Sequence, residues 1–263
     1  MKSVRDFAAA KAEGRKIVMV TAYDAWTARL LAAAPVDCVL VGDSAMMVMH
    51  GERDTLGATV ELMALHTRAV ARTAGDKFIV ADMPFLSFRK GTDCALDCAA
   101  ALLRVGAHAV KLEGVRGHAD VVHHLVESGI PVMGHLGLTP QSVHALGGYK
   151  VQAREPAAAA QLREDAAALE TAGCFAIVLE CVPAALAESV TAALAIPTIG
   201  IGAGAGCDGQ VLVLHDLLGC NPGFQPKFAR KFADVAGVVV DGVTRYAEAV
   251  RKGQFPDAKE SFR

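Results

Sequence analysis

Eight short apolar runs, separated in most cases by helical stretches, are the feature that most limits how this chain can fold. The runs lie at 17–20, 38–41, 78–81, 109–112, 131–133, 176–179, 198–201 and 211–214. They are apolar at nearly every position rather than at alternate positions, which predicts strands buried on both faces of a parallel sheet. Helix-like patterns lie at 24–34, 60–74, 95–105, 119–128, 157–172 and 184–193.

The alternation of strands and helices predicts an α/β fold, namely a (β/α)8 barrel. An open, doubly wound sheet is the competing architecture, but eight strand candidates in 263 residues favour the barrel. The segment 202–210 is too short for a full helix between the last two strands. We expect an N-terminal helix in 1–14, closing helices in 226–252 and one domain over 1–263, because no linker-like composition divides the chain.

Composition argues against several classes of partner. Lys and Arg together number 26 and Asp and Glu 28, and this balance disfavours a nucleic acid or an anionic membrane as partner. The longest apolar stretches fall well short of the roughly 18 residues of a membrane span. The seven cysteines form no CxxC pair and several stand inside apolar runs. We therefore expect reduced, buried thiols in a cytoplasmic protein.

Acidic residues follow four of the predicted strands: Asp43, Asp82, Glu113 and Glu180. Because the carboxyl ends of parallel barrel strands meet at the face that carries the active site, we expect these side chains to converge. Any one of them alone is equally well explained as a helix cap. Clustered carboxylates, however, repel one another unless a cation or protons intervene. A hard divalent ion with oxygen ligands, best matched by Mg²⁺, would remove this repulsion.

Two further residues and one loop are candidates for the same face. Side chains alternate along a strand, so Lys111 shares the face of Glu113; it forms either a structural ion pair or a cation for an anionic substrate. His135 follows the fifth strand and is either an acid, base or hydrogen-bond donor, or a neutral anchor of its loop. The polar segment 51–59 follows the second strand and is either a lid or an ordinary surface loop.

A glycine-rich segment after the seventh strand invites a different interpretation. Gly200, Gly202 and Ala205 have the spacing of a dinucleotide-binding fingerprint. The next strand follows directly, however, with no helix whose N-terminus could receive a pyrophosphate. We interpret these glycines as allowing tight packing or the close approach of a ligand.

Ten blocks, in order over nearly the whole chain, resemble the ketopantoate hydroxymethyltransferase family. They include Val41-Gly42-Asp43-Ser44, Ala81-Asp82-Met83-Pro84-Phe85, Val110-Lys111-Leu112-Glu113-Gly114, Gly134-His135-Leu136-Gly137-Leu138-Thr139-Pro140-Gln141 and Leu179-Glu180-Cys181-Val182-Pro183. The resemblance implies a barrel of the phosphoenolpyruvate/pyruvate-binding type. It also implies transfer of a hydroxymethyl group from 5,10-methylenetetrahydrofolate to 3-methyl-2-oxobutanoate, giving 2-dehydropantoate for pantothenate and coenzyme A biosynthesis.

The resemblance also assigns roles to residues. Asp43, Asp82 and Glu113 match the family's Mg²⁺ site. Ser44, Asp82 and Lys111 match its keto-acid contacts, and with Asp43 and His135 they form the predicted substrate-binding set. Glu180 matches its proposed base. The resemblance further implies a homo-oligomer, a decamer of two pentameric rings.

The residues and the resemblance lead to one mechanism, in which a base removes a proton next to the ketone and the metal stabilises the enolate. Glu180 is the preferred base over His135, because a carboxylate accepts a proton without adding positive charge beside the metal and Lys111. Two alternatives remain open at this point. A metal-dependent lyase of 2-oxo or 2-hydroxy acids would use the same groups, and a non-catalytic small-molecule binder would need fewer of them.

Overall fold

A computed structural model describes residues 3–223 and 225–262 of the chain. The chain forms two compact units that divide between Val213 and Leu214. The first unit contains all eight strands. One domain over 1–263 stays a prediction.

Eight parallel strands pair in chain order and close into a barrel, as predicted. They are β1 (Ile17–Thr21), β2 (Cys38–Val41), β3 (Phe78–Asp82), β4 (Ala109–Glu113), β5 (Val132–Gly137), β6 (Ala176–Glu180), β7 (Thr198–Ile201) and β8 (Gly209–Leu212). The last strand begins earlier than the predicted 211, since Gly209 already pairs with both Ile17 and Ile199. A Cβ at Gly209 would lie 2.5 Å from the main-chain oxygen of Ile17, so glycine permits this pairing.

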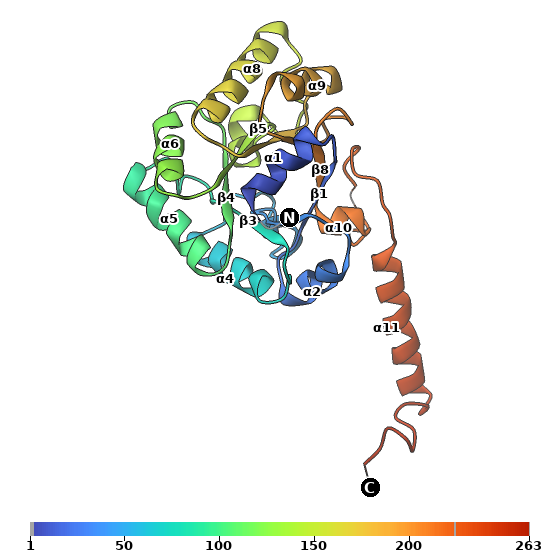
Figure 1. Cartoon of the computed structure of the whole chain (residues 1–263). Helices are drawn as coiled ribbons and strands as arrows, with labels where there is room; N and C mark the ends of the chain where they lie inside the picture. The colour runs from blue at the N-terminus through green and yellow to red at the C-terminus, as the bar shows by residue number, and fades with distance from the viewer. Residues whose placement is uncertain (1–2, 224, 263) are drawn as a thin grey trace. The chain divides into compact units, whose positions relative to one another are not determined.

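Helices connect most of the strands and surround the barrel (Figure 1). The six predicted ones are α2 (Ala25–Ala33), α4 (Val60–Ala71), α5 (Thr92–Arg104), α6 (Ala119–Glu127), α8 (Pro156–Thr171) and α9 (Ala184–Ala193). Four short elements were not predicted, because none is long enough to show a helical period: α3 (Ala45–Val48), η1 (Pro140–Ser142), α7 (Val143–Leu146) and α10 (Leu214–Leu217), which begins at the last residue of the predicted strand 211–214. Residues 202–208 contain no helix, as predicted from their length.

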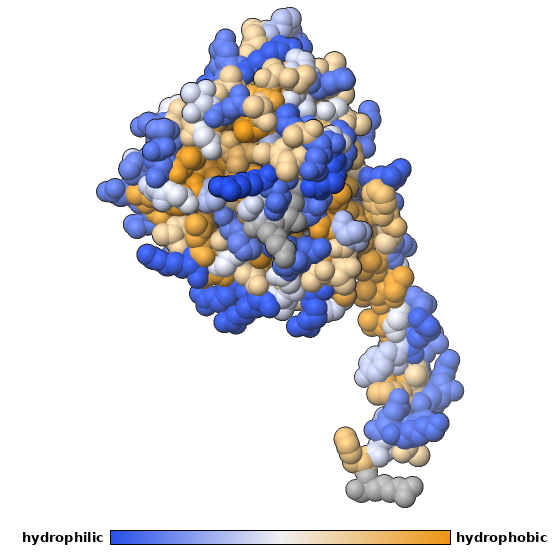
Figure 2. All heavy atoms as spheres, viewed as in Figure 1, coloured by the Kyte–Doolittle hydropathy of each residue, from blue (hydrophilic) through white to orange (hydrophobic). Residues whose placement is uncertain are grey.

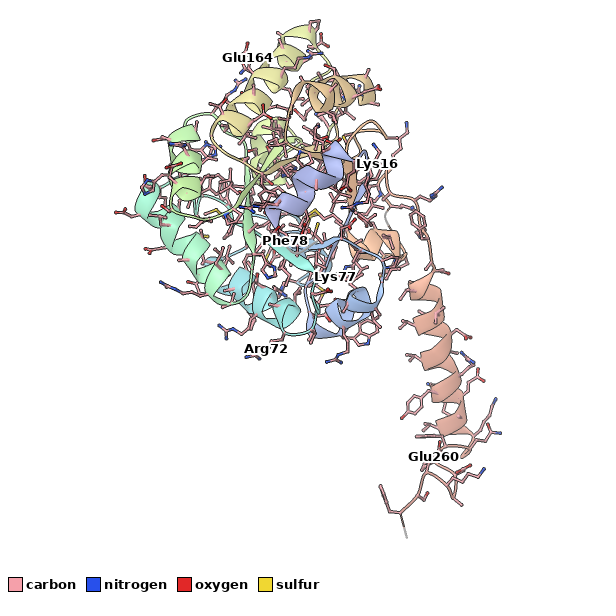
Figure 3. All side chains as sticks on the ribbon, viewed as in Figure 1. Lys16, Arg72, Lys77, Phe78, Glu164 and Glu260 are labelled. Carbon is pink, nitrogen blue, oxygen red and sulfur yellow. The ribbon has the colours of Figure 1, made fainter. Side chains whose placement is uncertain are left out.

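Apolar side chains fill the amino-terminal end of the barrel. Helix α1 (Val4–Ala12) lies there and inserts Phe7, which is 0% exposed. The Phe7 ring packs edge-on against Phe78 and Phe175, with ring centroids 5.3 and 5.1 Å apart. Phe78 lies beside α1 near the centre of the view, whereas Arg72 lies on the rim (Figure 3). Polar chemistry is therefore left to the opposite end.

The second unit contains α10 (Leu214–Leu217) and α11 (Val235–Arg251). Asp234 begins α11 by accepting a hydrogen bond from the Gly237 N–H at 3.3 Å. No described residue of α11 is buried, and Figure 2 shows apolar side chains exposed along it. Helix was expected over 226–252, but residues 226–234 are not helical.

The structure bears on two expectations drawn from composition, one about membrane spans and one about cysteines. None of the helices that the structure describes is long and apolar enough to cross a membrane. All seven cysteines are free, and five are buried. The expectation of burial is wrong for Cys94, which is exposed in the first turn of α5, and for the half-buried Cys220.

Candidate active site

The charged residues predicted from the sequence gather at the carboxyl-terminal end of the barrel. Strand register explains the convergence: Asp82 is paired with Lys111, and Glu113 with His135, on neighbouring strands. Lys111 and Glu113 are 5% and 4% exposed, and both side chains face inward, since Lys111 contacts Asp82 and Glu113 contacts His135. Glu180 ends β6, and its side chain is 15% exposed at the mouth.

An acidic pair and a lysine form the deepest part of the site. Asp43 follows β2, and its main-chain N–H donates to Asp82 Oδ2 at 3.0 Å. Lys111 Nζ lies 2.8 Å from Asp82 Oδ1. Burial and the charges of Asp82 and Glu113 raise the pKa of Asp43 well above its usual value. Burial alone would lower the pKa of Lys111, but the neighbouring carboxylates outweigh it and keep the amine protonated.

His135 lies between two carboxylates. Its Nδ1 is 3.4 Å from Glu113 Oε1, and its Nε2 is 3.1 Å from Glu180 Oε2. Burial and Lys111 lower the pKa of His135, but Glu113 and Glu180 outweigh them and raise it to about 9. The imidazole is therefore a cation at neutral pH. Lys111 Nζ lies 3.4 Å from Nδ1, a contact of like charges that the surrounding carboxylates offset.

Ser44 lies at the edge of this cluster and is held by a residue that the sequence analysis did not single out. Tyr23 follows β1, is 1% exposed, and places its hydroxyl 2.8 Å from Ser44 Oγ. Burial raises the pKa of Tyr23, so the phenol stays protonated. Tyr23 could have been identified from its position just after a predicted strand, but the sequence analysis looked mainly for charged residues at those positions.

Gln141 is a second residue that the sequence analysis did not assign. It lies in η1 after β5, is 7% exposed and donates from Nε2 to Asp43 Oδ2 at 2.8 Å. It was visible only as part of the Thr139-Pro140-Gln141 turn. Gln141 is uncharged and belongs to no periodic pattern, so nothing in the sequence distinguishes it from an ordinary turn residue.

Gly137 explains how β5 and β6 approach each other beside Glu180. Its φ of +92° is in the region that favours glycine. A Cβ at this position would collide with the main-chain oxygen of Glu180. That oxygen instead accepts a hydrogen bond from the Leu138 N–H at 2.8 Å. Glycine is therefore needed for the backbone geometry next to Glu180.

The donor set at this end of the barrel fits a hard divalent cation. Asp43, Asp82 and Glu113 are buried within one cluster, and burial together with the negative charges of Asp82 and Glu113 raises the pKa of Asp43. Within residues 3–223 and 225–262, no three His, Cys, Asp or Glu side chains are arranged to hold an ion together. An ion would therefore take fewer direct protein ligands and complete its shell with water or substrate, as Mg²⁺ commonly does.

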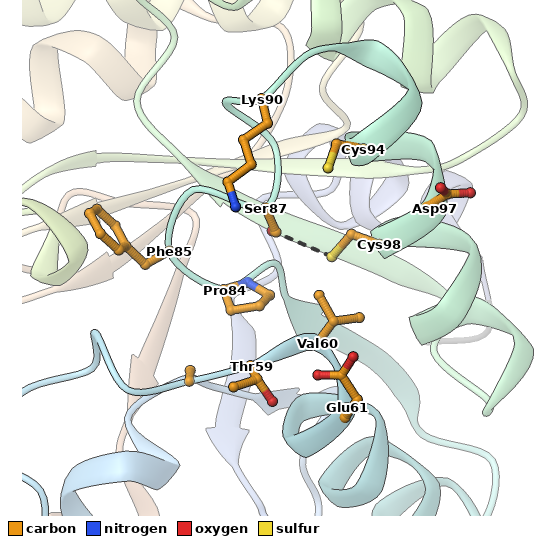
Figure 4. A pocket seen from close by; sticks show the side chains of 11 residues that line it. Thr59, Val60, Glu61, Pro84, Phe85, Ser87, Lys90, Cys94, Asp97 and Cys98 are labelled. Atoms are coloured by element: carbon orange, nitrogen blue, oxygen red, sulfur yellow. Dashed lines mark hydrogen bonds between the residues drawn. The ribbon is translucent and has the colours of Figure 1, made fainter.

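A pocket of about 360 Å³ opens elsewhere, between α4, the segment after β3, and α5 (Figure 4). Its lining includes Thr59, Glu61, Ser87 and Cys98, and the Cys98 thiol donates to Ser87 Oγ at 3.4 Å. None of the predicted site residues lines it. The predicted lid 51–59 reaches this pocket with its last two residues.

Three lines of comparison place the chain among known proteins. The family described as ketopantoate hydroxymethyltransferase matches residues 1–258. A protein of Bdellovibrio bacteriovorus named 3-methyl-2-oxobutanoate hydroxymethyltransferase is 52% identical over 262 residues, covering 100% of both chains. A protein of the same name from Francisella tularensis subsp. novicida is 48% identical over 100% of this chain and 99% of its own.

Solved structures share the barrel fold. Phosphonopyruvate hydrolase, crystallised with oxalate and Mg²⁺, has a TM-score of 0.63 at 13% identity, covering 99% of this chain and 93% of its own. A 2,3-dimethylmalate lyase of the PEP mutase/isocitrate lyase superfamily has a TM-score of 0.60 at 16% identity, covering 100% and 92%. At such identities the likeness shows the fold alone. The full-length match at about half identity does more, and by it the chain belongs to the ketopantoate hydroxymethyltransferase family.

Proposed function

We propose that this protein transfers a hydroxymethyl group from 5,10-methylenetetrahydrofolate to 3-methyl-2-oxobutanoate, forming 2-dehydropantoate in pantothenate biosynthesis. The acceptor and the transfer are those in the names of its relatives. The observation that carries the proposal is the buried ion pair of Asp82 and Lys111 together with the partly exposed Glu180 at the barrel mouth. Removing a proton next to a ketone needs an anchored acid group, a stabiliser of oxyanion charge and a base.

Lys111 and Ser44 are the proposed anchors of the keto acid. Lys111 is a buried cation whose position is fixed by Asp82 at 2.8 Å, so it attracts the substrate carboxylate without needing to reorganise. The Ser44 hydroxyl, positioned by Tyr23, is a hydrogen-bond partner for a substrate oxygen. The His135 imidazolium contributes positive potential from the other side.

Mg²⁺ is the proposed cofactor, and Asp43, Asp82 and Glu113 are its proposed ligands, directly or through water. When bound, it would supply positive charge next to the ketone oxygen during proton removal. The three carboxylates stand at the ends of consecutive strands β2, β3 and β4. Their mutual repulsion is the physical reason for a cation here.

Glu180 is the proposed base. Its Oε2 lies 3.1 Å from His135 Nε2, and His135 already carries its protons at neutral pH because its pKa is about 9. As a cation, His135 attracts the Glu180 carboxylate and has no free lone pair with which to compete for the proton. The partly exposed side chain of Glu180 faces the mouth, where the substrate would enter.

The protein is further proposed to work in the cytoplasm as a homo-oligomer, with a decamer as the expected form. Val239, Val243, Tyr246 and Val250 of α11 recur at helical spacing and are all 45% exposed or more. Such an apolar stripe is typical of a helix that packs against a partner. Light scattering of the full chain gives the mass; a stable monomer would contradict this part.

Proton exchange separates the base from the rest of the reaction. With Mg²⁺ but no folate, the wild type is expected to exchange the C3 proton of 3-methyl-2-oxobutanoate for deuterium, followed by NMR. Glu180→Gln keeps the shape of the side chain, so exchange should collapse while keto-acid binding survives; His135→Ala should lose less. Wild-type exchange by Glu180→Gln together with none by His135→Ala would reverse the assignment.

Product analysis and chelation test the rest. Addition of 5,10-methylenetetrahydrofolate should yield 2-dehydropantoate, whereas cleavage of a carbon–carbon bond without folate would identify a lyase. A chelator should abolish turnover and Mg²⁺ should restore it. Asp82→Ala should lose metal-dependent keto-acid binding, and Asp165→Ala, at an α8 carboxylate paired with Arg116, should not. Full activity in metal-free buffer would refute the cofactor.

A further inference from the structure

Gln141 connects the ends of three neighbouring strands. Its Nε2 donates to Asp43 Oδ2 at 2.8 Å and to the main-chain oxygen of Met83 at 2.9 Å. Its main-chain N–H donates to Glu113 Oε2 at 3.0 Å. Asp43 follows β2, Met83 follows β3 and Glu113 ends β4. One residue from the turn after β5 therefore contacts the end of every strand that carries a proposed metal ligand.

The partners of Gln141 fix the orientation of its amide. A carboxylate oxygen and a main-chain carbonyl oxygen accept hydrogen bonds and cannot donate them, so only the NH2 side of the amide fits between them. The main chain is restricted as well, because Pro140 has a fixed φ and the Ser142 N–H donates to the Thr139 oxygen at 2.8 Å. At 7% exposure, Gln141 is thus held in one arrangement.

Each of the three carboxylates has one oxygen held by an N–H donor. Gln141 holds Asp43 Oδ2 and Glu113 Oε2, and the Asp43 N–H holds Asp82 Oδ2 at 3.0 Å. Hydrogen bonds of this kind orient metal ligands and limit how far like charges can move apart. Of the other oxygens, Asp82 Oδ1 lies 2.8 Å from Lys111 Nζ and Glu113 Oε1 lies 3.4 Å from His135 Nδ1.

We propose that Gln141 is a positioning residue for the divalent cation, which sets the spacing of the Asp43 and Glu113 carboxylates without touching the cation or the substrate. The inference rests on the metal dependence proposed above. Without the amide, Asp43 loses the donor that opposes its repulsion from Asp82. Removal of such an outer contact typically weakens metal binding by about 10- to 100-fold.

Titration of Mn²⁺ followed by EPR of the free ion measures this effect on the full chain without substrate. Gln141→Met keeps the length of the side chain and removes both of its donors. Gln161→Met is the matched control, because Gln161 Nε2 donates to Asp165 Oδ1 at 3.0 Å on α8, outside the site. The Mn²⁺ dissociation constant should rise by about 10- to 100-fold in Gln141→Met and stay unchanged in Gln161→Met.

Turnover gives a readout that a general loss of structure would not mimic. In Gln141→Met the Mg²⁺ concentration for half-maximal rate should rise by a similar factor, while kcat at saturating Mg²⁺ stays close to that of the wild type. Should this variant not fold, Gln141→Asn keeps the amide but is too short to reach both partners, and it is measured in the same way.

The outcomes separate this inference from the proposed function. Equal Mn²⁺ affinity of the wild type and of either folded Gln141 variant overturns the role of Gln141 alone. A wild type that binds no Mn²⁺ overturns the proposed metal site as well. A kcat that stays low at saturating Mg²⁺ also contradicts positioning.

Discussion

The two ends of the barrel bury side chains equally well but of opposite kinds. At the amino-terminal end Phe7 and Phe78 are 0% and 3% exposed, and at the carboxyl-terminal end Asp82 and Lys111 are 2% and 5% exposed. Burial of apolar area stabilises the fold by roughly 25 cal/mol per Å², whereas burial of charge costs free energy unless each group is paired. The comparison teaches that stability is concentrated at one end of the strands and reactivity at the other.

The largest expected effect comes from replacing Lys111, at the carboxyl-terminal end of the barrel, with methionine. Lys111→Met should lower kcat/KM by about 10³-fold or more, because it removes the cation proposed to bind the substrate carboxylate. It should also tighten Mn²⁺ binding, since Lys111 repels a cation beside Asp82. Steady-state kinetics and EPR titration measure both.

Lys77→Met is the matched control at the amino-terminal end, where Lys77 Nζ donates to the main-chain oxygens of Ala34 and Val36 at 2.8 and 3.0 Å. It should leave kcat/KM close to the wild type. Weaker Mn²⁺ binding by Lys111→Met, or a large loss of turnover in Lys77→Met, would break the division between the two ends.

The converse change is Phe7→Ala. It removes a fully buried ring that contacts Phe78 and Phe175, and such a truncation lowers the free energy of unfolding by about 3–5 kcal/mol. Turnover well below the melting temperature should stay near the wild type, because no site residue is touched. Urea denaturation and kinetics on one preparation test this. Loss of kcat without loss of stability would contradict it.

These residues also show how far the sequence alone could lead. The alternation of side chains along a strand placed Lys111 and Glu113 on one face. The positions of Asp82 and Glu180 at the ends of apolar runs placed them at the barrel mouth. Both inferences need only the local sequence. Gln141 was not predictable in the same way. Its contacts to Asp43 and Met83 span 98 and 58 positions, and barrel closure alone brings these residues together.

Fold boundaries were missed for related physical reasons. Strand β8 begins at Gly209, which has no apolar side chain to signal a strand. Helix α3 is a single turn after Asp43, too short for a periodic pattern. The hydroxyl contact of Tyr23 with Ser44 spans 21 positions, and it depends on how β1 and β2 align.

Histidines at the two ends should respond to pH with opposite signs. The pKa of His135 is raised from 6.5 to about 9, so its stabilisation is complete below pH 6.5 and is lost as pH rises through 9. The raised pKa of His135 therefore contributes about 3 kcal/mol to the free energy of unfolding at low pH. Burial lowers the pKa of His108, so its contribution is present above pH 6.5 and is lost on acidification.

Urea denaturation in chelator across this pH range, for the wild type, His135→Gln and His108→Gln, separates the two contributions. Buried thiols also favour unfolding at high pH, but they are common to all three proteins. An alkaline loss of stability as steep in His135→Gln as in the wild type would contradict the assignment.

The smallest expected effect concerns the predicted lid 51–59, which borders the mouth. Its start is anchored, because His66 Nδ1 donates to the Tyr23 oxygen and leaves Nε2, 2.9 Å from His50 Nε2, to accept a hydrogen bond. Amide exchange in 51–59 should be fast in the free protein and slower with keto acid and Mg²⁺. Slow exchange that ligands do not change would show a fixed loop.

The apolar filling of the amino-terminal end of the barrel affects how a hydrogen-isotope label on the substrate can reach solvent. The residues packed around Phe7 inside the barrel are apolar, and the His108 ring, stacked on Phe78 at 5.3 Å, is itself exposed to solvent, so this apolar layer separates Glu180 from the titratable groups below it. In the proposed reaction, a proton taken by Glu180 would therefore either return to the substrate or leave through the mouth. With the proposed folate substrate bound over the mouth, label from C3 of the keto acid could reach solvent only when the mouth opens. The rate of label loss would then report mouth opening and not the rate of C–H bond cleavage.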